Sequence, residues 1–448
     1  MKASKKKALN IRIFVVGCFF GFLFAIISVK AFYLHVFKGP WLSKRAATEY
    51  RISSVSNGKR GIIYDRNYHV MAVTIDGQSI AAHPKKIKNP AKNARLLANT
   101  LDMKTATLKK RLASNRSFVW VKRRVSPRET KQIQKLELEG LDFIPEHDRH
   151  YTKRTLAAQV IGFTGTDGKG LEGLEYSYNK YLAGTQARST FIKDALGRRL
   201  THNEKVDDRM ASSASSGNNL ILTLDQTIQY ISENVLKDTV EQFRAKSGIA
   251  IVMNPTTGAV LALAHYPEFN PNTFRDFDNE QWRNRAITDP FEPGSTMKVF
   301  SAAAAIETKA FPNDTIFYCE KGAYKIGRNT VHDTKPHAWL TLEKIIKVSS
   351  NIGMIKVSEK TGAMALYNTF RKFGFGKRTG IDCPGETAGS LSDYTKWSDI
   401  DKGTISFGHG LSVSAIQLVT ATCAIANGGI LMKPYIVQAH NQANWRAG

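Results

Sequence analysis

The chain is organised around the stretch Asp289-Pro290-Phe291-Glu292-Pro293-Gly294-Ser295-Thr296-Met297-Lys298-Val299-Phe300. Pro293 and Gly294 predict a turn, and the alanine-rich run after Phe300 favours a helix that begins at Ser295. Ser295 and Lys298 are then three residues apart on one helical face, which brings an amine close to a hydroxyl. A lysine can take the proton of a serine hydroxyl when burial and nearby positive charge lower its pKa. The stretch therefore predicts a nucleophilic serine with its general base.

The Ser-x-x-Lys spacing is not specific by itself, because it also occurs at residues 4–7 and 56–59. The sequence around the Ser-x-x-Lys motif is more informative. Phe291 to Lys298 resembles the active-site helix of the penicillin-binding proteins, and Ser349-Ser350-Asn351 resembles the second motif of that family, Ser-x-Asn. Without the resemblance, Ser349-Ser350-Asn351 would be read as a helix N-cap, which is compatible with a catalytic role.

The formal charge of +26 is concentrated in the first half of the chain. Residues 1–224 hold 40 Lys and Arg against 17 Asp and Glu (+23), and residues 225–448 hold 24 against 21 (+3). No zinc-finger spacing or groove-reading module accompanies this excess, so we do not expect a nucleic-acid partner. A basic face near an anionic membrane or cell-wall polymer fits the pattern better.

No metal or organic cofactor is predicted. The eleven histidines show no ligand spacing, and the four cysteines include no Cys-x-x-Cys pair. A disulfide between Cys319 and Cys383 stays open at this level. Gly168-x-Gly170-x-x-Gly173 fits the spacing of a dinucleotide fingerprint, but no second βα unit follows it. The segment is also expected outside the membrane, where a nicotinamide cofactor is not supplied.

An N-terminal membrane anchor is predicted. Basic residues, including Lys5 to Lys7 and Arg12, precede an uncharged run from Ile13 to Val29 that continues past Lys30 to Leu34. This run can cross a bilayer as one helix with Lys30 reaching the interface. The positive flank predicts that the N-terminus stays in the cytoplasm and that the bulk of the chain is extracytoplasmic. The run lacks a small-x-small cleavage pattern at its end, so an uncleaved anchor is favoured over a signal peptide.

The segment after the anchor resembles the pedestal of class B penicillin-binding proteins. Arg60 to Asn67 matches the signature Arg-Gly-x-Ile-x-Asp-Arg-Asn, and further landmarks follow at Arg149-His150-Tyr151, Gln159 to Phe163 and Gly170 to Glu175. The chain departs from the family pattern at Tyr68, at Met71-Ala72 and at Thr152, where proline is common; the change at Thr152 affects a turn and not the chemistry.

Two β-type runs around Asn254 to Gly258 predict a hairpin over residues 248–264, after a helix over Thr227 to Phe243. In the family this hairpin provides the first two strands of an antiparallel sheet, on which the active-site helix packs. A small polar segment at residues 210–218 predicts the boundary between pedestal and catalytic domain.

The resemblance implies acyl transfer. Ser295 would attack the peptide bond between the two terminal D-alanines of a cell-wall stem peptide, and Lys298 would take and return the proton. Ser349 would relay this proton to the leaving amine, and Asn351 would hold the substrate backbone and Lys298. An amine of a neighbouring stem peptide would then resolve the ester and form a cross-link. Penicillins and other β-lactams would trap Ser295 covalently.

The family also has a third motif, Lys-Thr/Ser-Gly, on a strand next to one N–H group of the oxyanion hole. Lys360-Thr361-Gly362 follows Asn351 too closely and predicts a helix end capped by Gly362. A later landmark is present at Ser406 to Leu418, and a strand is predicted over Ile430 to Val437. We expect the remaining strands and closing helix to be absent, as in a truncated or frameshifted copy. Because loss of one oxyanion donor typically costs about a hundred- to a thousandfold in rate, little activity is expected.

The sequence therefore predicts an α+β protein with one transmembrane helix, an elongated pedestal and a penicillin-binding/transpeptidase domain of the serine β-lactamase-like type. Its antiparallel sheet would be flanked by helices and would lack the C-terminal strands. The predicted segments are a cytoplasmic basic tail (1–12), the anchor (13–37), a pedestal of the dimerisation type (50–209), a linker (210–218), an incomplete transpeptidase domain (219–437) and an atypical tail (438–448).

The predicted function is a D,D-transpeptidase of septal peptidoglycan synthesis in the cytoplasmic (inner) membrane. Phe291-Glu292-Pro293 favours the cell-division type, since elongation enzymes more often show Tyr-Pro-Pro. The expected partners are stem peptides ending in D-Ala-D-Ala, β-lactams, the membrane, a SEDS-type glycosyltransferase and other divisome proteins. The alternatives are a non-catalytic divisome scaffold, an elongation-type enzyme, and a penicillin sensor or β-lactamase, which would not be expected to carry the pedestal signatures.

Overall fold

The computed structural model describes residues 2–42, 51–192 and 215–441. The chain divides into two compact units, one formed by residues 1–58 with 185–215 and the other by residues 59–184 with 216–448. Some parts of the predicted segments lie outside the described residues, namely residue 1 of the basic tail, residues 50 and 193–209 of the pedestal, 210–214 of the linker and 442–448 of the atypical tail.

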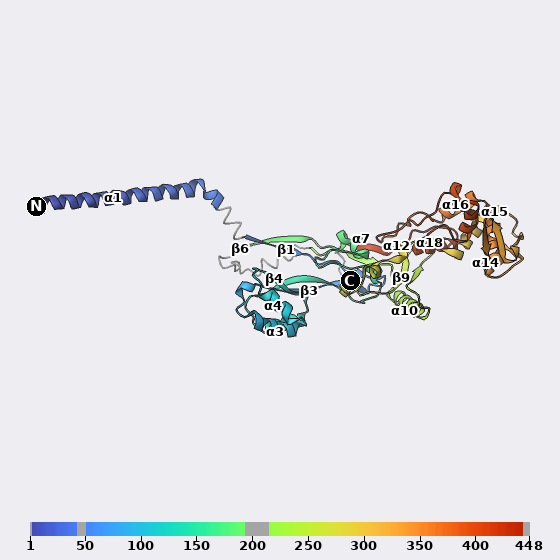
Figure 1. Cartoon of the computed structure of the whole chain (residues 1–448), viewed down its shortest axis with the longest axis horizontal. Coiled ribbons are helices and arrows are strands. Elements are labelled where there is room, and N and C mark those ends of the chain that lie inside the picture. Colours follow the sequence, from blue (N-terminus) through green and yellow to red (C-terminus); the bar gives the residue numbers. More distant parts are fainter. Residues whose placement is uncertain (1, 43–50, 193–214, 442–448) are drawn as a thin grey trace. The chain divides into compact units, whose positions relative to one another are not determined.

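The first unit contains a long N-terminal helix and a two-stranded sheet (Figure 1). Helix α1 spans Lys2–Phe32 and continues as a π-helical turn, η1, over Tyr33–Phe37. The segment Phe14–Phe37 is long and apolar enough to cross a membrane and is not buried by other described parts of the chain, which is compatible with a single-pass anchor. Strand β1 (Arg51–Asn57) pairs antiparallel with β6 (Gln186–Ile192).

The second unit contains a six-stranded sheet in the order β14-β7-β2-β3-β4, with β5 on the other edge of β3. The strands are β2 (Ile63–Tyr64), β3 (Val70–Ala82), β4 (Val119–Val125), β5 (Leu141–Tyr151), β7 (Asn219–Leu222) and β14 (Val437–Asn441). The start of β3 pairs with β2 and its end with β4. The parallel pairing of β2 with β7 joins residues that precede the predicted linker to residues that follow it.

The strand predicted over residues 430–437 was wrong in position. Residues 430–434 form no strand, and the strand β14 begins only at Val437, where it pairs antiparallel with β7. Pro434 has no N–H group to donate to a ladder. The carboxylate of Asp382 accepts the N–H groups of Ile436 and Val437 at 2.8 and 2.7 Å. Residues 438–441, predicted to belong to the tail, are therefore part of the sheet.

Three helices pack on the end of the sheet that contains β4, namely α3 (Pro90–Leu101), α4 (Thr105–Leu112) and α5 (Pro127–Gln134) (Figure 1). Asn89 caps α3 and Ser126 caps α5, each followed by a proline in the first turn, so both helices begin where capping chemistry predicts. Their apolar faces form one core with β3 and β4; it includes Ile80, Leu97, Leu101, Leu108, Leu112, Val121 and Ile133.

The pedestal landmarks meet in a buried ionic cluster. Glu175 is fully buried and accepts from Arg60 Nε at 2.5 Å and from Arg149 Nε at 2.7 Å. Arg60 also donates to the Glu175 carbonyl at 2.7 Å, and Arg149 to the Gly61 carbonyl at 2.7 Å. Three of the four pedestal landmarks are thus joined through Arg60, Arg149 and Glu175, which have a structural role.

The glycines of the supposed dinucleotide fingerprint serve close packing. A Cβ atom on Gly170 would lie 1.8 Å from the carbonyl oxygen of Glu175, and one on Gly173 would lie 2.5 Å from that of Val160. Gly173 also has a φ of +59°, in the left-handed region. The spacing reflects the tight turn that presents Glu175 to the two arginines.

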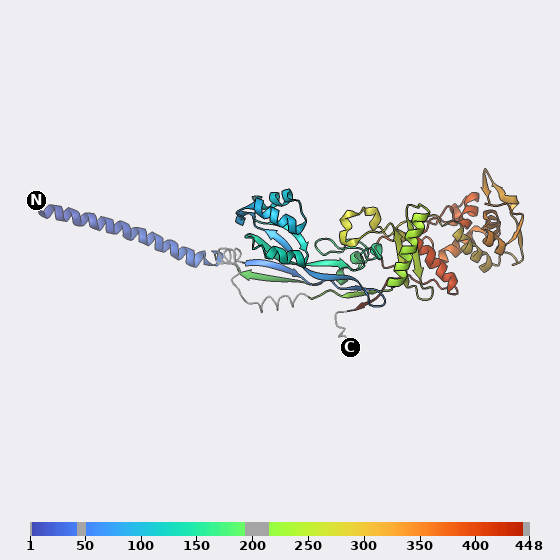
Figure 2. The same cartoon turned by 90° about the horizontal axis from the view of Figure 1, so that it is seen from below.

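The predicted hairpin and the helix before it are confirmed. Strand β8 (Gly248–Met253) pairs antiparallel with β9 (Val260–Tyr266), and α10 (Gln226–Gln242) packs against both. Asp225 caps α10 by accepting the N–H groups of Thr227 and Ile228. In Figure 2, α10 lies between the six-stranded sheet and the helices around the site.

The other short elements near the sheet and hairpin are α6 (Ala158–Ile161), α7 (Gly173–Ser177), α8 (Asn179–Leu182), η2 (Pro84–Lys86), η3 (Pro271–Asp276), α11 (Asn279–Trp282) and α12 (Arg285–Thr288). The part of the second unit that contains Ser295 and Lys298 is called the site lobe. Its elements are η4 (Gly294–Met297), α13 (Lys298–Glu307), β10 (Ile316–Tyr318), η5 (Glu320–Gly322), β11 (Ala323–Ile326), β12 (Asn329–His332), β13 (Trp339–Thr341), α14 (Leu342–Val348), α15 (Asn351–Thr361), α16 (Ala363–Lys372), η6 (Tyr394–Lys396), α17 (Asp399–Thr404), η7 (Ile405–Phe407) and α18 (Ala415–Ala426).

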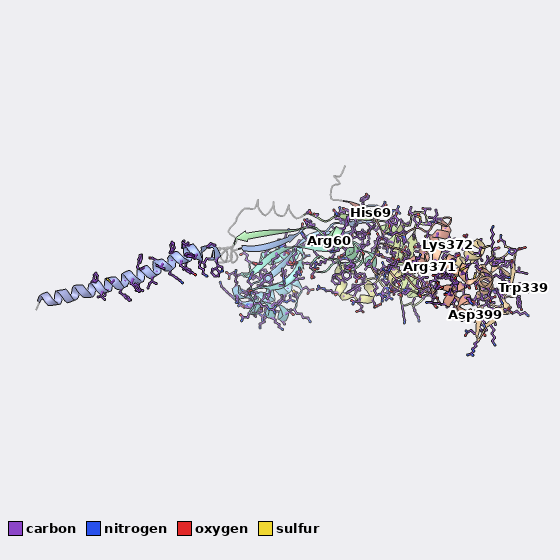
Figure 3. All side chains as sticks on the ribbon, turned by 90° about the horizontal axis from the view of Figure 1, so that it is seen from above. Arg60, His69, Trp339, Arg371, Lys372 and Asp399 are labelled. Carbon is purple, nitrogen blue, oxygen red and sulfur yellow. The ribbon has the colours of Figure 1, made fainter. Side chains whose placement is uncertain are left out.

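The site lobe lies at one end of the second unit, where Trp339 and Asp399 mark it in Figure 3. The fold is α+β with open sheets, as predicted. The four cysteines are free thiols, so no disulfide joins Cys319 to Cys383.

Candidate active site

The turn Gly294–Met297, which contains Ser295 and is called the nucleophile turn below, differs in one detail from the prediction. The α-helix does not begin at Ser295; residues Gly294–Met297 form a 3₁₀ turn, and α13 begins at Lys298. Gly294 adopts a φ of +59°, which a residue without a side chain reaches at no steric cost. In a 3₁₀ turn, side chains three residues apart eclipse each other. The turn therefore aligns Ser295 with Lys298 more closely than an α-helix would.

Lys298 is the centre of the site. Its side chain is buried, at 2% exposure, whereas Ser295 and Ser349 are open to solvent. The amine Nζ lies 2.6 Å from the Ser349 carbonyl oxygen, 2.8 Å from Asn351 Oδ1, 2.9 Å from Ser349 Oγ and 3.2 Å from Ser295 Oγ. Ser349 Oγ is 3.1 Å from Ser295 Oγ. All four predicted site residues are thus in one hydrogen-bonded group.

Burial prepares Lys298 to accept a proton. It lowers the pKa of the amine to about 8, against a smaller upward effect of the Asp333 carboxylate. A neutral amine has two N–H donors and one lone pair. The two shortest contacts, to the Ser349 carbonyl and Asn351 Oδ1, can take both donors and leave the lone pair for the hydroxyl of Ser295.

The second motif is held between two helices. Ser349 ends α14 with a φ of +58°, which turns the chain sharply and points its carbonyl to Lys298. Ser350 is the N-cap of α15 and accepts the N–H of Gly353 at 2.9 Å. Asn351 is the first residue of that helix, and its amide donates to the His332 carbonyl at 3.1 Å. The cap interpretation is therefore correct, and it coexists with the contacts to Lys298.

Sequence reasoning missed Asp333, which follows β12. Its carboxylate accepts from Ser350 Oγ at 2.6 Å, from the Asn351 N–H at 2.5 Å and from the Ile352 N–H at 3.0 Å. It thereby fixes the start of α15 from outside, and it supplies the negative charge that acts on Lys298. The local sequence around Asp333 could not have predicted these contacts, because the partner residues are almost twenty positions away in the chain.

The landmark at Ser406 to Leu418 supports the nucleophile turn. The Gly294 N–H donates to the Gly408 carbonyl at 3.1 Å, and Phe291 forms a bridge with Val413. Gly408 has a φ of +90°, and a Cβ atom there would lie 2.1 Å from the Gly294 carbonyl oxygen. The backbone of this loop therefore holds the turn by direct contact.

The alternative lysine motif is structural, as predicted. Lys360-Thr361-Gly362 ends α15, where Thr361 Oγ1 donates to the Val357 carbonyl and Gly362 caps the helix with a φ of +86°. Among the residues that the structure describes, no group of His, Cys, Asp or Glu is arranged to hold a metal ion. The chemistry that the four site residues support is proton transfer to an amine coupled to attack by a serine oxygen.

Comparisons with known proteins agree with this geometry. Residues 248–446 match the family "Penicillin binding protein transpeptidase domain", and residues 55–222 match "Penicillin-binding Protein dimerisation domain". The probable peptidoglycan D,D-transpeptidase PenA of Neisseria gonorrhoeae is 35% identical over 96% of this chain and 74% of its own length. The peptidoglycan D,D-transpeptidase FtsI of Escherichia coli K12 is 33% identical over 85% of this chain and 64% of its own length.

A solved structure is also similar. The crystal structure of a peptidoglycan synthetase from Bifidobacterium adolescentis superposes with a TM-score of 0.65 at 26% identity, and the match covers 88% of this chain and 76% of that one.

Proposed function

Because this chain belongs to the penicillin-binding protein transpeptidase family, we propose that it is a serine-type peptidoglycan D,D-transpeptidase whose nucleophile is Ser295. The observation that carries the proposal is the cluster around Lys298, in which one buried amine lies within 3.2 Å of oxygen atoms from Ser295, Ser349 and Asn351. The family acts on peptidoglycan stem peptides and binds β-lactams.

In the first half-reaction, Ser295 Oγ attacks the carbonyl carbon between the two terminal D-alanines, and its proton moves to Lys298 Nζ. The tetrahedral intermediate then collapses, and the C–N bond breaks. The leaving nitrogen needs a proton, which Ser349 Oγ can deliver because it lies 2.9 Å from Lys298 Nζ. The products are free D-alanine, an acyl-serine ester and a neutral Lys298, so no proton is gained or lost.

In the second half-reaction, the amine of a neighbouring stem peptide attacks the ester carbon. Its proton passes to Lys298 and returns to Ser295 Oγ as the ester bond breaks, which forms the cross-link and restores the enzyme. Asn351 keeps Lys298 oriented in both steps and presents its amide to the substrate backbone. A β-lactam follows only the first half-reaction, because its leaving nitrogen stays attached to the acyl group.

The setting of this activity is also part of the proposal. We assign the anchor to residues 13–37 in the cytoplasmic membrane, with residues 1–12 inside, the pedestal to residues 50–209, the linker to 210–218 and the catalytic domain to 219–437. We place the enzyme in septal synthesis with a SEDS-type glycosyltransferase and other divisome proteins as partners. The wording of Phe291-Glu292-Pro293 and the similarity to relatives named FtsI support this assignment.

The proposal is tested by labelling the purified full chain in detergent with a fluorescent penicillin. The sequence alone led us to expect little activity, but the contacts of Lys298 with Ser295, Ser349 and Asn351 support acylation. The wild type should therefore be labelled in a time-dependent manner, and Ser295→Ala should lose the label. Ser301→Ala is a matched control, since Ser301 lies on α13, the helix that follows the turn of Ser295, and donates to the Ser406 carbonyl. Equal labelling of Ser295→Ala and the wild type, or no labelling of a folded wild type, would contradict the proposal.

A further inference from the structure

A strongly basic stretch precedes and forms strand β4. Between Met103 and Arg128 the chain has nine Lys and Arg residues and no Asp or Glu. Part of this stretch folds around a groove of about 820 Å³. The groove lies in the pedestal part of the chain, where nothing in the acyl-transfer chemistry uses it.

One wall of the groove comes from the end of α4 and the loop after it, with Lys110, Arg111, Ser114 and Arg116. The other wall is β4, which pairs only with β3 and is therefore an edge strand of the sheet. Arg111 connects the two walls, since its guanidinium donates to the Val121 carbonyl at 2.6 Å. Six consecutive residues, Phe118 to Arg123, line this wall, and an extended chain is the ligand that contacts a run of consecutive strand residues.

Two aromatic rings provide apolar contact area in the groove. Phe118 and Trp120 are two residues apart at the start of β4 and therefore point to one face of the strand. Their rings meet edge to face with centroids 5.1 Å apart. Phe118 is 38% exposed, and Arg123 lies over the Trp120 ring at 5.3 Å.

The polar groups of the groove are only partly satisfied. Lys122 pairs with Glu129 and Arg123 with Glu146. By contrast, Lys110, Arg111 and Arg116 are exposed and form no ion pair with an acid in the described parts of the chain. The hydroxyl oxygen of Ser114 is buried and has no hydrogen-bond partner among the described residues. A bound carboxylate would supply partners for these groups.

We propose that the groove between α4 and the edge strand β4 binds an extended acidic segment of a partner protein. Carboxylates of the segment pair with Lys110 and Arg116, and alternate apolar side chains pack on Phe118 and Trp120. The combination favours a peptide over a phosphate or a lipid headgroup. A small anion would use the cations and leave the aromatic face exposed, whereas an extended peptide presents charged and apolar side chains alternately. The proposal stands on the groove alone and does not depend on the transpeptidase reaction.

The test uses the full chain in detergent and a fluorescent synthetic peptide in which glutamate and valine alternate, with binding read by fluorescence anisotropy. A peptide of the same composition, in which the glutamates and valines form two separate blocks, is the control ligand. The alternating peptide should bind more tightly, and its affinity should fall as salt screens the charges. Equal affinity of the two peptides would overturn the proposal, because charge alone would then explain binding.

The groove variant combines Lys110→Glu with Arg116→Glu. The matched surface variant combines Lys92→Glu with Lys131→Glu, on the exposed surfaces of α3 and α5. Both double variants change the net charge of the protein by the same amount. The groove variant should weaken binding by about tenfold or more and the surface variant by less than about threefold. Phe118→Ala should also weaken binding. An equal loss of peptide affinity in both double variants overturns the proposal. In a competition experiment, unlabelled peptide should displace the fluorescent peptide. Stronger displacement by glycerol 3-phosphate or by soluble peptidoglycan fragments also overturns the proposal. Thermal unfolding of each variant shows that it is folded.

Discussion

Among single residues, the protonation of Lys298 decides whether the proposed attack by Ser295 can occur. Only the neutral amine can take the proton of Ser295, and burial lowers the pKa of this amine to about 8. Below this pH the ammonium form dominates and the rate of acylation should fall about tenfold per unit of pH; above it the rate should level off. The rate of acylation is measured from about pH 6 to 10 by labelling with fluorescent penicillin and quenching the reaction after fixed times. A rate that is flat through pH 8 would show that Lys298 is not the base.

Asp333 provides the second prediction at this scale. Replacing it with asparagine removes the negative charge that raises the pKa of Lys298, so the midpoint of the pH profile should move to lower pH. The substitution also weakens the contacts to Ser350, Asn351 and Ile352. We therefore expect the plateau rate to fall by about tenfold or more. Asp314→Asn, at an exposed position before β10, is the control. An unshifted midpoint with Asp333→Asn would contradict the electrostatic part of this account.

The proximity of Ser295 and Lys298 could be predicted from the sequence, because the two residues are only three positions apart. Asp333 could not be predicted, because its contacts are made through the fold, and neither could the left-handed conformation of Ser349. The roles of Ser349 and Asn351 came from the resemblance to a family. The structure adds that both reach Lys298, and their catalytic roles stay a prediction until variants are measured.

At the scale of secondary-structure elements, the central contact is between the nucleophile turn and the loop at Gly408. Gly408→Ala would place a Cβ atom 2.1 Å from the Gly294 carbonyl oxygen, so the turn must move. Acylation should become at least about tenfold slower, because small displacements of a nucleophile are costly. Gly428→Ala is the matched control: its φ of +86° is close to the +90° of Gly408, but no atom lies within 4 Å of the added group. Equal acylation rates in the two variants would contradict the supporting role of the loop.

Local sequence patterns were sufficient to predict some of the helices and strands. The β8–β9 hairpin, α10 and α15 were predicted because periodicity, turn residues and caps all agree locally. Strand β14 was misplaced, because its position depends on Asp382 and on pairing with β7, neither of which is local. The 3₁₀ turn before α13 was also missed, since an α-helix and a 3₁₀ turn share the same early sequence signals.

At the scale of the whole molecule, the pedestal part of the second unit depends on Glu175. Glu175→Gln would leave Arg60 and Arg149 buried without a counter-charge, and we expect the free energy of unfolding to fall by about 3 to 5 kcal/mol. Glu139→Gln is the control, because the Lys88–Glu139 pair is exposed and should contribute at most about 1 kcal/mol. Chemical denaturation of both variants measures the difference. A similar small effect in both would show that the buried cluster is not a main source of stability.

The arrangement of the second unit also limits what sequence alone can predict. Pedestal landmarks and the hairpin before the site were predicted separately, yet residues from both segments share one hydrophobic core that includes Ile63, Leu174, Leu220, Leu263, Ile287 and Ile436. The parallel pairing of β2 with β7 follows from this shared core. Long-range pairing of this kind leaves little trace in local sequence patterns, because each strand contributes only a few residues.

We propose above all that Ser295 forms an acyl-enzyme with the help of Lys298. The most direct measurement is the mass of the intact chain after incubation with benzylpenicillin, followed by digestion and location of the adduct. The account predicts one penicillin per chain, attached to the peptide that contains Ser295, and a loss of the adduct in Ser295→Ala. It also predicts a strongly reduced rate in Lys298→Ala. An adduct on another residue, or the absence of an adduct on folded protein, would contradict it.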